Sequence, residues 1–153
     1  MSDRGGALVK IADLVAESNR IEGIYREPSA AEIAEHRRFM QLSAVTVEEL
    51  QNFVKVYQPN AVLRDRPGLN VRVGSYYPPP GGPEIRERLE KLLKLVDSHT
   101  PWQMHIAYET LHPFTDGNGR SGRMLWYWCM QELNPQLIFL HRFYYQTLQS
   151  VGR

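Results

Sequence analysis

The twelve residues HPFTDGNGRSGR, at positions 112–123, lie between two segments of helical periodicity and differ in composition from both. They combine an imidazole, a carboxylate, an amide side chain with a glycine on either side, and two guanidinium groups. The glycines allow left-handed backbone, so that successive N–H groups can point into one concavity at the N-terminus of the following helix. Such a helix end binds phosphate, and the helix dipole adds to the attraction. We therefore expect residues 112–123 to form a phosphate-binding loop between two helices.

The charged side chains of this loop supply the other parts of a group-transfer site. Arg120 and Arg123 are three residues apart, which places them on neighbouring positions of one helix face, and a planar guanidinium suits phosphate oxygens. Asp116 is a hard oxygen ligand of the kind that shares Mg²⁺ with substrate phosphates. His112 can take a proton from a hydroxyl at neutral pH. Together these residues predict the transfer of a phosphate-containing group from a nucleotide.

Outside this loop the apolar residues repeat with helical spacing, which predicts an all-α domain. Ser, Thr and Pro mark helix starts near Pro28-Ser29 and at Thr100-Pro101, and Thr46 to Glu49 has the form of a capping box. The expected helices cover residues 8 to about 20, about 28–42, a third from the capping box to before Pro59, then 83–96, 101–111, about 119–133 and roughly 137–150.

One stretch of different composition interrupts the helical pattern. Residues 67–82 are rich in proline and glycine and contain Arg72 as their only charge, so they cannot continue a helix. Within them Leu69, Val71 and Val73 alternate with polar residues, which suits a short strand or hairpin. We expect a small β-hairpin over residues 69–77.

Length and charge restrict the classes of function. The chain has 153 residues, enough for one domain with a sizeable core, and its 18 Lys+Arg against 17 Asp+Glu leave no basic field for nucleic acid or an anionic membrane. No apolar run approaches the roughly 18 residues of a membrane span, and residues 1–10 lack the apolar segment of a secretory signal. The single cysteine, Cys129, excludes an intramolecular disulfide. We expect one reduced, cytoplasmic domain over residues 1–153.

Other interpretations of the loop are weaker. Residues 117–122 match G-x-G-x-x-G, but a dinucleotide site needs a preceding strand and an acidic residue about 20 positions later, and the sequence offers neither. A P-loop is excluded because Gly-Lys-Ser/Thr does not occur. His105, Glu109 and His112 share a helix face and could hold zinc, although His105 fits better in a core. Taken singly, each loop residue also has a structural interpretation, such as a helix C-cap for His112; the combination favours a site.

With these residues the sequence resembles the Fic/Doc family. The family signature, His-x-Phe-x-Asp/Glu-Gly-Asn-Gly/Lys-Arg-x-x-Arg, is met at every position of residues 112–123. Residues 71–76, followed by two prolines, look like the family's flap, and residues 144–148 look like its closing helix. Residues 18–23 match the inhibitory motif Ser/Thr-x-x-x-Glu-Gly/Asn. The resemblance therefore covers nearly the whole chain and implies a Fic-type helical domain with a hairpin flap at residues 69–77.

The resemblance also implies roles for the loop. His112 would deprotonate a hydroxyl of a target protein, and Asp116 would hold Mg²⁺ on the α- and β-phosphates of ATP. Arg120 would support the anion-binding loop, and Arg123 would hold the γ-phosphate. The N–H groups of the following residues, together with an amide side chain, would steady the phosphates: Gly117, Asn118 and Gly119. His112 and Asn118 are the catalytic residues of this interpretation, and AMP passes to Ser, Thr or Tyr.

Further positions follow from the same resemblance. Gly74 of the flap and Tyr145 of the closing helix would contact the nucleotide, and a target protein would bind along the flap. Residues 8–23 would form an inhibitory helix, with Ser18 and Glu22 as its inhibitory residues and the Glu22 carboxylate reaching Arg123. Two alternatives stay open: phosphoryl transfer to a protein hydroxyl, and a catalytically silent, toxin-like interaction module held by another chain. Exposed apolar helix faces leave a homo-oligomer open as well.

Overall fold

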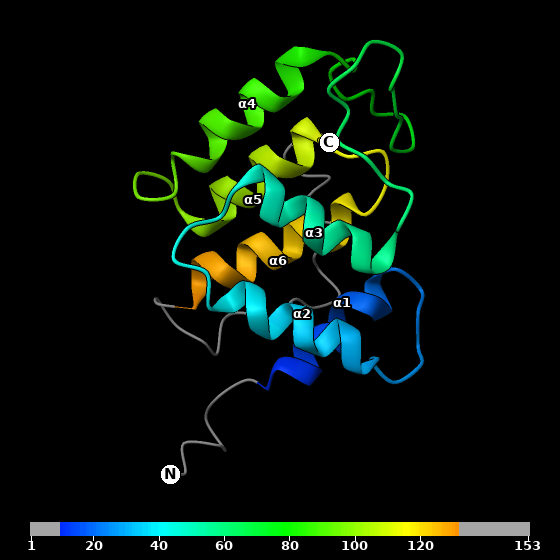
Figure 1. The fold of residues 1–153 in the computed structure, drawn as a ribbon, viewed down its shortest axis with the longest axis vertical. Helices are drawn as coiled ribbons and strands as arrows, with labels where there is room; N and C mark the ends of the chain where they lie inside the picture. Colours follow the sequence, from blue (N-terminus) through cyan, green and yellow to red (C-terminus); the bar gives the residue numbers. More distant parts are fainter. Residues whose placement is uncertain (1–9, 132–153) are drawn as a thin grey trace.

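The computed structural model describes residues 10–131, and within that range the chain forms six α-helices and no β-sheet (Figure 1). In chain order they are α1 (Ile11–Ile21), α2 (Ala30–Met40), α3 (Val47–Tyr57), α4 (Pro83–Leu93), α5 (Pro101–Leu111) and α6 (Asn118–Met130). The prediction of an all-α domain is confirmed.

Side-chain caps explain where several helices begin. The side chains of Ser29 and Thr100 each accept a hydrogen bond from the backbone N–H three residues later, that of Glu32 or Gln103. In turn, the side chains of Glu32 and Gln103 accept a hydrogen bond from the backbone N–H of the cap residue. At Thr46 only half of the expected capping box forms. The Thr46 side chain accepts from the backbone N–H of Glu49, whereas the Glu49 carboxylate turns to Arg38, 2.8 Å away.

Several predicted helix boundaries differ from the observed ones; the helices expected to reach residues 42 and 96, for example, end at Met40 and Leu93. The first helix begins at Ile11, three residues later than expected, because Lys10 has extended backbone angles. The helix of the signature begins at Asn118, directly after Gly117 in the left-handed conformation. The end expected at residue 133 and the helix expected over residues 137–150 lie outside the described residues.

The expected hairpin over residues 69–77 is reduced to a single turn. Val73 and Tyr76 exchange two backbone hydrogen bonds of 2.9 and 2.8 Å around Gly74, whose φ of 59° suits a tight reversal. Residues 69–72 form no ladder, because no neighbouring strand faces them among the described residues. The alternating pattern was therefore a poor guide to a strand here. We keep the name flap for residues 69–77.

Helix α6 lies across the middle of the bundle and contacts α1, α2, α3 and α5 (Figure 1). Its apolar side chains complete a core that includes buried residues from all six described helices: Leu14, Phe39, Phe53, Leu89, Tyr108 and Leu125. None of the described helices combines the length and hydropathy that crossing a bilayer requires.

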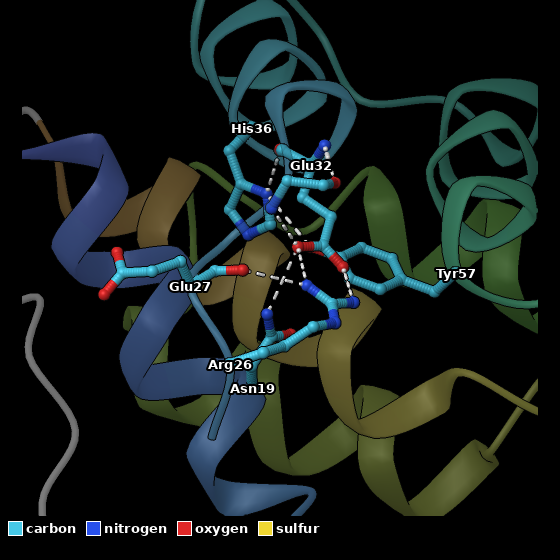
Figure 2. A network of polar contacts seen from close by, with 7 residues as sticks. Asn19, Arg26, Glu27, Glu32, His36 and Tyr57 are labelled. Carbon is cyan, nitrogen blue, oxygen red and sulfur yellow. Dashed lines mark hydrogen bonds and ion pairs between the residues drawn. The ribbon is translucent and has the colours of Figure 1, made fainter. Parts of the chain in front are cut away.

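A polar network joins the end of α1 to the beginning of α2 (Figure 2). The Glu32 carboxylate receives two hydrogen bonds from the Arg26 guanidinium at 3.0 and 2.8 Å, one from the Ser29 N–H at 2.8 Å and one from the Asn19 amide at 3.4 Å. The bond from Arg26 is the main cause that lowers the pKa of Glu32 to about 2. Because Asn19 belongs to α1 and Arg26 to the connecting loop, this carboxylate fixes the segment in which Glu22 lies.

His36 is buried next to this network. Its Nδ1–H donates to the Glu32 carbonyl oxygen at 3.0 Å, so the buried Nε2 would have to take up the second proton. Burial is the main cause that lowers the pKa of His36 to about 4, and the nearby charge of Arg123 acts in the same direction. The ring is therefore neutral in the folded protein at neutral pH.

We expect His36 to make the fold less stable in acid. The unfolded chain binds this proton near pH 6.5 and the folded protein only near pH 4, so unfolding takes up a proton between these values and stability falls as the pH decreases. From pH 7.5 to 5 the loss amounts to about 2 kcal/mol from this residue. Glu32 acts in the same direction only below about pH 4.5. Urea unfolding at pH 7.5 and pH 5 should show that His36→Gln loses less free energy of unfolding between the two pH values than the wild type does. An equal loss in both proteins would contradict the role given to His36. His99→Gln, at an exposed histidine, is the control.

Candidate active site

The signature loop begins where α5 ends. His112 is the C-cap of α5, with φ 52° and ψ 63°, and its N–H donates to the Tyr108 carbonyl at 2.9 Å. Left-handed backbone is unfavourable for a residue with a side chain, and such outliers collect at functional sites. The C-cap that was the structural alternative for His112 is thus present, and the half-buried imidazole begins the loop.

The loop is held against residues 62–64 by an antiparallel pairing. Thr115 N–H donates to the Val62 carbonyl, and Arg64 N–H donates to the Pro113 carbonyl, both at 2.9 Å. Between them Phe114 is fully buried in the core. This pairing fixes the position of the loop relative to the flap, because residues 62–64 lead directly into the flap.

Asn118 holds the loop from inside. Its Oδ1 accepts from the Phe114 N–H at 2.9 Å, and its Nδ2–H donates to the Phe114 carbonyl at 2.8 Å. The side chain is 2% exposed, so both polar atoms of the amide are committed to the loop. In this arrangement Asn118 shapes the backbone of the loop, and its expected contact with a phosphate stays a prediction.

Arg123 is the charged group that α6 directs toward α1. Its side chain is 1% exposed, its Nε–H donates to the Ser18 hydroxyl at 2.8 Å, and its Nη2 donates to the Ser18 carbonyl at 3.2 Å. The same Nη2 lies 2.6 Å from Oε2 of Glu22. The structure thus brings together Glu22 and Arg123, as the resemblance implied, and adds Ser18 as a second partner of Arg123.

The Glu22 carboxylate also lies against the first turn of α6. A Cβ at Gly119 would come within 2.6 Å of Oε2 of Glu22 and 3.2 Å of Nη1 of Arg123. Helix α6 has no side-chain cap at its N-terminus, where N–H groups and the helix dipole favour an anion. The carboxylate therefore occupies a place at the helix end that suits an anion.

Arg120 points to a different neighbour from Arg123. Its guanidinium carbon lies 4.4 Å from the centroid of the Tyr57 ring in α3, and its side chain is buried. A guanidinium over an aromatic face gains a cation–π attraction. The two arginines of the signature therefore flank the α6 N-terminus and contact α1 and α3 separately.

Asp116 is the exposed carboxylate of the loop. Its Oδ1 accepts from the Gly117 N–H at 2.8 Å, and Gly117 has a φ of 78°. An exposed carboxylate beside an uncapped helix N-terminus fits the donor chemistry of Mg²⁺ shared with phosphates. No group of three metal-binding side chains gathers among residues 10–131, so the zinc alternative for His105, Glu109 and His112 finds no support there.

Of the other two expected site residues, Gly74 and Tyr145, the structure describes only Gly74, and within the described residues it does not bring Gly74 to the signature loop. Gly74 forms the tip of the flap turn, and no contact joins it to the signature loop in the part of the chain that the structure describes. The flap is instead anchored through Tyr76, whose hydroxyl donates to the Thr110 carbonyl in the last turn of α5 at 2.7 Å. Tyr145 lies outside the described residues.

These features define a helical domain in which a buried arginine and an uncapped helix end form an anion-binding site beside a histidine-bearing loop. The sequence model of the Fic/DOC family matches residues 14–130 of the chain. The chain belongs to the Fic/DOC family. That family is known in general for transferase activity, including AMPylation.

Two glycines of α6 provide a matched test of how tightly the signature helix is packed. A Cβ at Gly122 would clash with the Glu109 carboxylate and approach Cδ1 of Tyr108 to 3.1 Å, both in the tightly packed α5. A Cβ at Gly119 meets only the ends of flexible side chains. We expect Gly122→Ala to lower the free energy of unfolding by about 1–3 kcal/mol. Gly119→Ala should change it by less than about 1 kcal/mol. Equal effects in thermal or urea unfolding would contradict this packing.

Proposed function

We propose that the chain is a protein adenylyltransferase that transfers AMP from ATP to a Ser, Thr or Tyr hydroxyl of a target protein, and that Glu22 inhibits the transfer. The observation that carries the proposal is the contact of the Glu22 carboxylate with both Arg123 and the first turn of α6. A carboxylate held by a buried guanidinium at a helix N-terminus marks a site that recognises the charge of a phosphate.

In the proposed reaction His112 takes the proton from the acceptor hydroxyl. The hydroxyl oxygen forms a bond to the α-phosphorus of ATP, and the bond from that phosphorus to the oxygen bridging to the β-phosphate breaks. Pyrophosphate leaves with the electron pair, and AMP remains on the acceptor. Because the chain provides no covalent intermediate in this scheme, positioning and charge stabilisation supply most of the rate enhancement.

The cationic groups of α6 would stabilise the charge that shifts during this step. The N-terminal N–H groups of α6 would face the phosphates, with Arg120 and Arg123 on either side. Asp116 would hold Mg²⁺, which when bound neutralises phosphate charge. Arg123 is already held in its orientation by Ser18, so little ordering is needed when a phosphate binds.

Inhibition follows from competition for one guanidinium. The Arg123 Nη2 that contacts Glu22 at 2.6 Å is the group proposed for the γ-phosphate. A carboxylate and a phosphate cannot occupy the same place, so ATP would bind in an unproductive position while Glu22 remains. The Arg26–Glu32 network supports this state because it fixes the backbone that follows Glu22.

The flap supplies the proposed binding surface for the acceptor. Around its turn lies a hollow lined by Asn70, Val71, Arg72, Tyr77, Pro78 and Pro80. The backbone of residues 69–72 forms no ladder with another described segment, so an extended peptide can pair with it by main-chain hydrogen bonds. Such pairing would hold a hydroxyl in register without requiring one sequence.

Removal of the Glu22 carboxylate should activate the enzyme. We expect Glu22→Gly to raise self-modification with AMP, at matched ATP and Mg²⁺, by a factor in the range of about 5–150 that couplings between competing sites reach. Glu27→Gly makes the same change at an exposed glutamate whose carboxylate points away from the network in Figure 2. If both variants behave like the wild type, the inhibitory role of Glu22 is wrong.

Labelled ATP distinguishes the proposed reaction from its alternatives. In the Glu22→Gly protein, label should pass to protein from [α-³²P]ATP and not from [γ-³²P]ATP. Addition of His112→Ala should reduce the rate by about 10²–10⁴-fold, the usual contribution of a general base. Transfer from the γ-position alone would indicate a phosphotransferase. Absence of transfer from either position, with added protein hydroxyl acceptors, would favour the silent interaction module.

A further inference from the structure

Arg64 is fully buried, and its guanidinium is surrounded by backbone carbonyls. Nε–H donates to the His112 carbonyl at 2.7 Å, and Nη2 donates to the Leu111 carbonyl at 2.9 Å. Nη1 donates to the carbonyls of Leu69 at 3.2 Å and Pro79 at 2.8 Å. One side chain therefore connects the end of α5 to both ends of the flap.

The charge of Arg64 is compensated in an unusual way. No carboxylate forms an ion pair with it in the described range, residues 10–131. Its acceptors include the last carbonyls of α5, which lack partners within the helix and carry the negative end of the helix dipole. Five N–H donors in a rigid plane are suited to four acceptors in different directions, which an ammonium group cannot match.

Two of the four carbonyls, those of Leu111 at the end of α5 and of His112 at the start of the loop, adjoin the proposed base. His112 has left-handed backbone, a conformation that a residue with a side chain adopts only when its surroundings impose it. Arg64 binds the carbonyl on each side of the His112 N–Cα unit, those of Leu111 and His112. The Arg64 backbone adds a bond to Pro113 on the next residue.

The other two carbonyls fix the flap. Leu69 begins the flap, Pro79 follows it, and Gly82 N–H donates to the Arg64 carbonyl at 3.0 Å immediately before α4. The Tyr76 hydroxyl also ties the flap turn to the Thr110 carbonyl, so these bonds together link the flap to the last turn of α5.

We propose that Arg64 is a positioning residue of the transfer reaction, which sets the His112 base and the acceptor-binding flap at a fixed distance from each other. This inference rests on the proposed function for the roles of His112 and of the flap. Arg64 contacts neither Arg123 nor the first turn of α6, so it acts on the acceptor side of the site and not on the phosphate side.

A kinetic test separates positioning from general stability. In the Glu22→Gly background we expect Arg64→Lys to lower kcat by about tenfold or more, while KM for ATP changes less than about twofold. Arg66→Lys, two residues away at an exposed arginine, should leave both constants unchanged. An unchanged kcat would overturn the proposal, and so would a parallel loss of kcat, ATP affinity and thermal stability, since that pattern belongs to a merely structural residue.

Hydrogen exchange tests the same connection without any activity. In Arg64→Lys, exchange should increase together in residues 69–80 and 111–116, with no increase in α2 and α3. An increase in one of the two segments alone would overturn the proposed connection. If Glu22→Gly transfers nothing, the proposed function fails while this exchange result still decides the role of Arg64.

If Arg64→Lys does not fold, the wild-type protein provides the decision. The Arg64 N–H donates to the Pro113 carbonyl of the loop, and the Gly82 N–H, after the flap, donates to the Arg64 carbonyl. In native-state hydrogen exchange these two amides should then show the same free energy of opening. Separate openings of these two amides would overturn the proposal.

Discussion

A buried guanidinium must be matched by anions or hydrogen-bond acceptors, and the arrangement around Arg123 follows from that requirement. The Ser18 hydroxyl and carbonyl satisfy part of the group from α1, and the Glu22 carboxylate supplies the counter-charge. Because Glu22 is also in contact with Gly119, the same carboxylate lies at the positive end of α6. The proposed phosphate site thus receives its counter-charge from a side chain of the protein itself. Competition between carboxylate and phosphate is the physical basis of the proposed inhibition.

The parts of the site differ in how firmly they are held. Asn118 and the pairing of residues 62–64 with residues 113–115 fix the loop from the core, and Arg64 extends that frame to the flap. Glu22 is held less firmly, since its side chain is 35% exposed and contacts Arg123 through one oxygen. The signature loop is therefore held from several sides, whereas the Glu22 carboxylate is the partly exposed partner of the buried Arg123. In the proposed inhibition, release of Glu22 would therefore require no rearrangement of the loop.

The sequence predicted the all-α fold and most helix starts, because caps such as Ser29 and Thr100 act within one turn of the chain. At the flap the alternation suggested a longer hairpin than the structure has, because only Val73 and Tyr76 pair there within the described residues. The contact of Glu22 with Arg123 spans 101 positions and could be anticipated only through the resemblance to a family motif. Arg64 left no signal, since its four acceptors are backbone carbonyls that any residue type provides. The stacking of Arg120 on Tyr57 was missed for a similar reason, because it joins two helices distant in the sequence.

The most direct test of this account is the position of the γ-phosphate in crystals of the wild-type protein and of Glu22→Gly, each grown with Mg²⁺ and a non-hydrolysable ATP analogue. The account predicts that γ-phosphate oxygens contact the Arg123 guanidinium when the carboxylate is removed, and that in the wild type Arg123 stays with Glu22 while the γ-phosphate lies elsewhere. A triphosphate bound in the same position in both proteins, or one that never approaches Arg123, would contradict it.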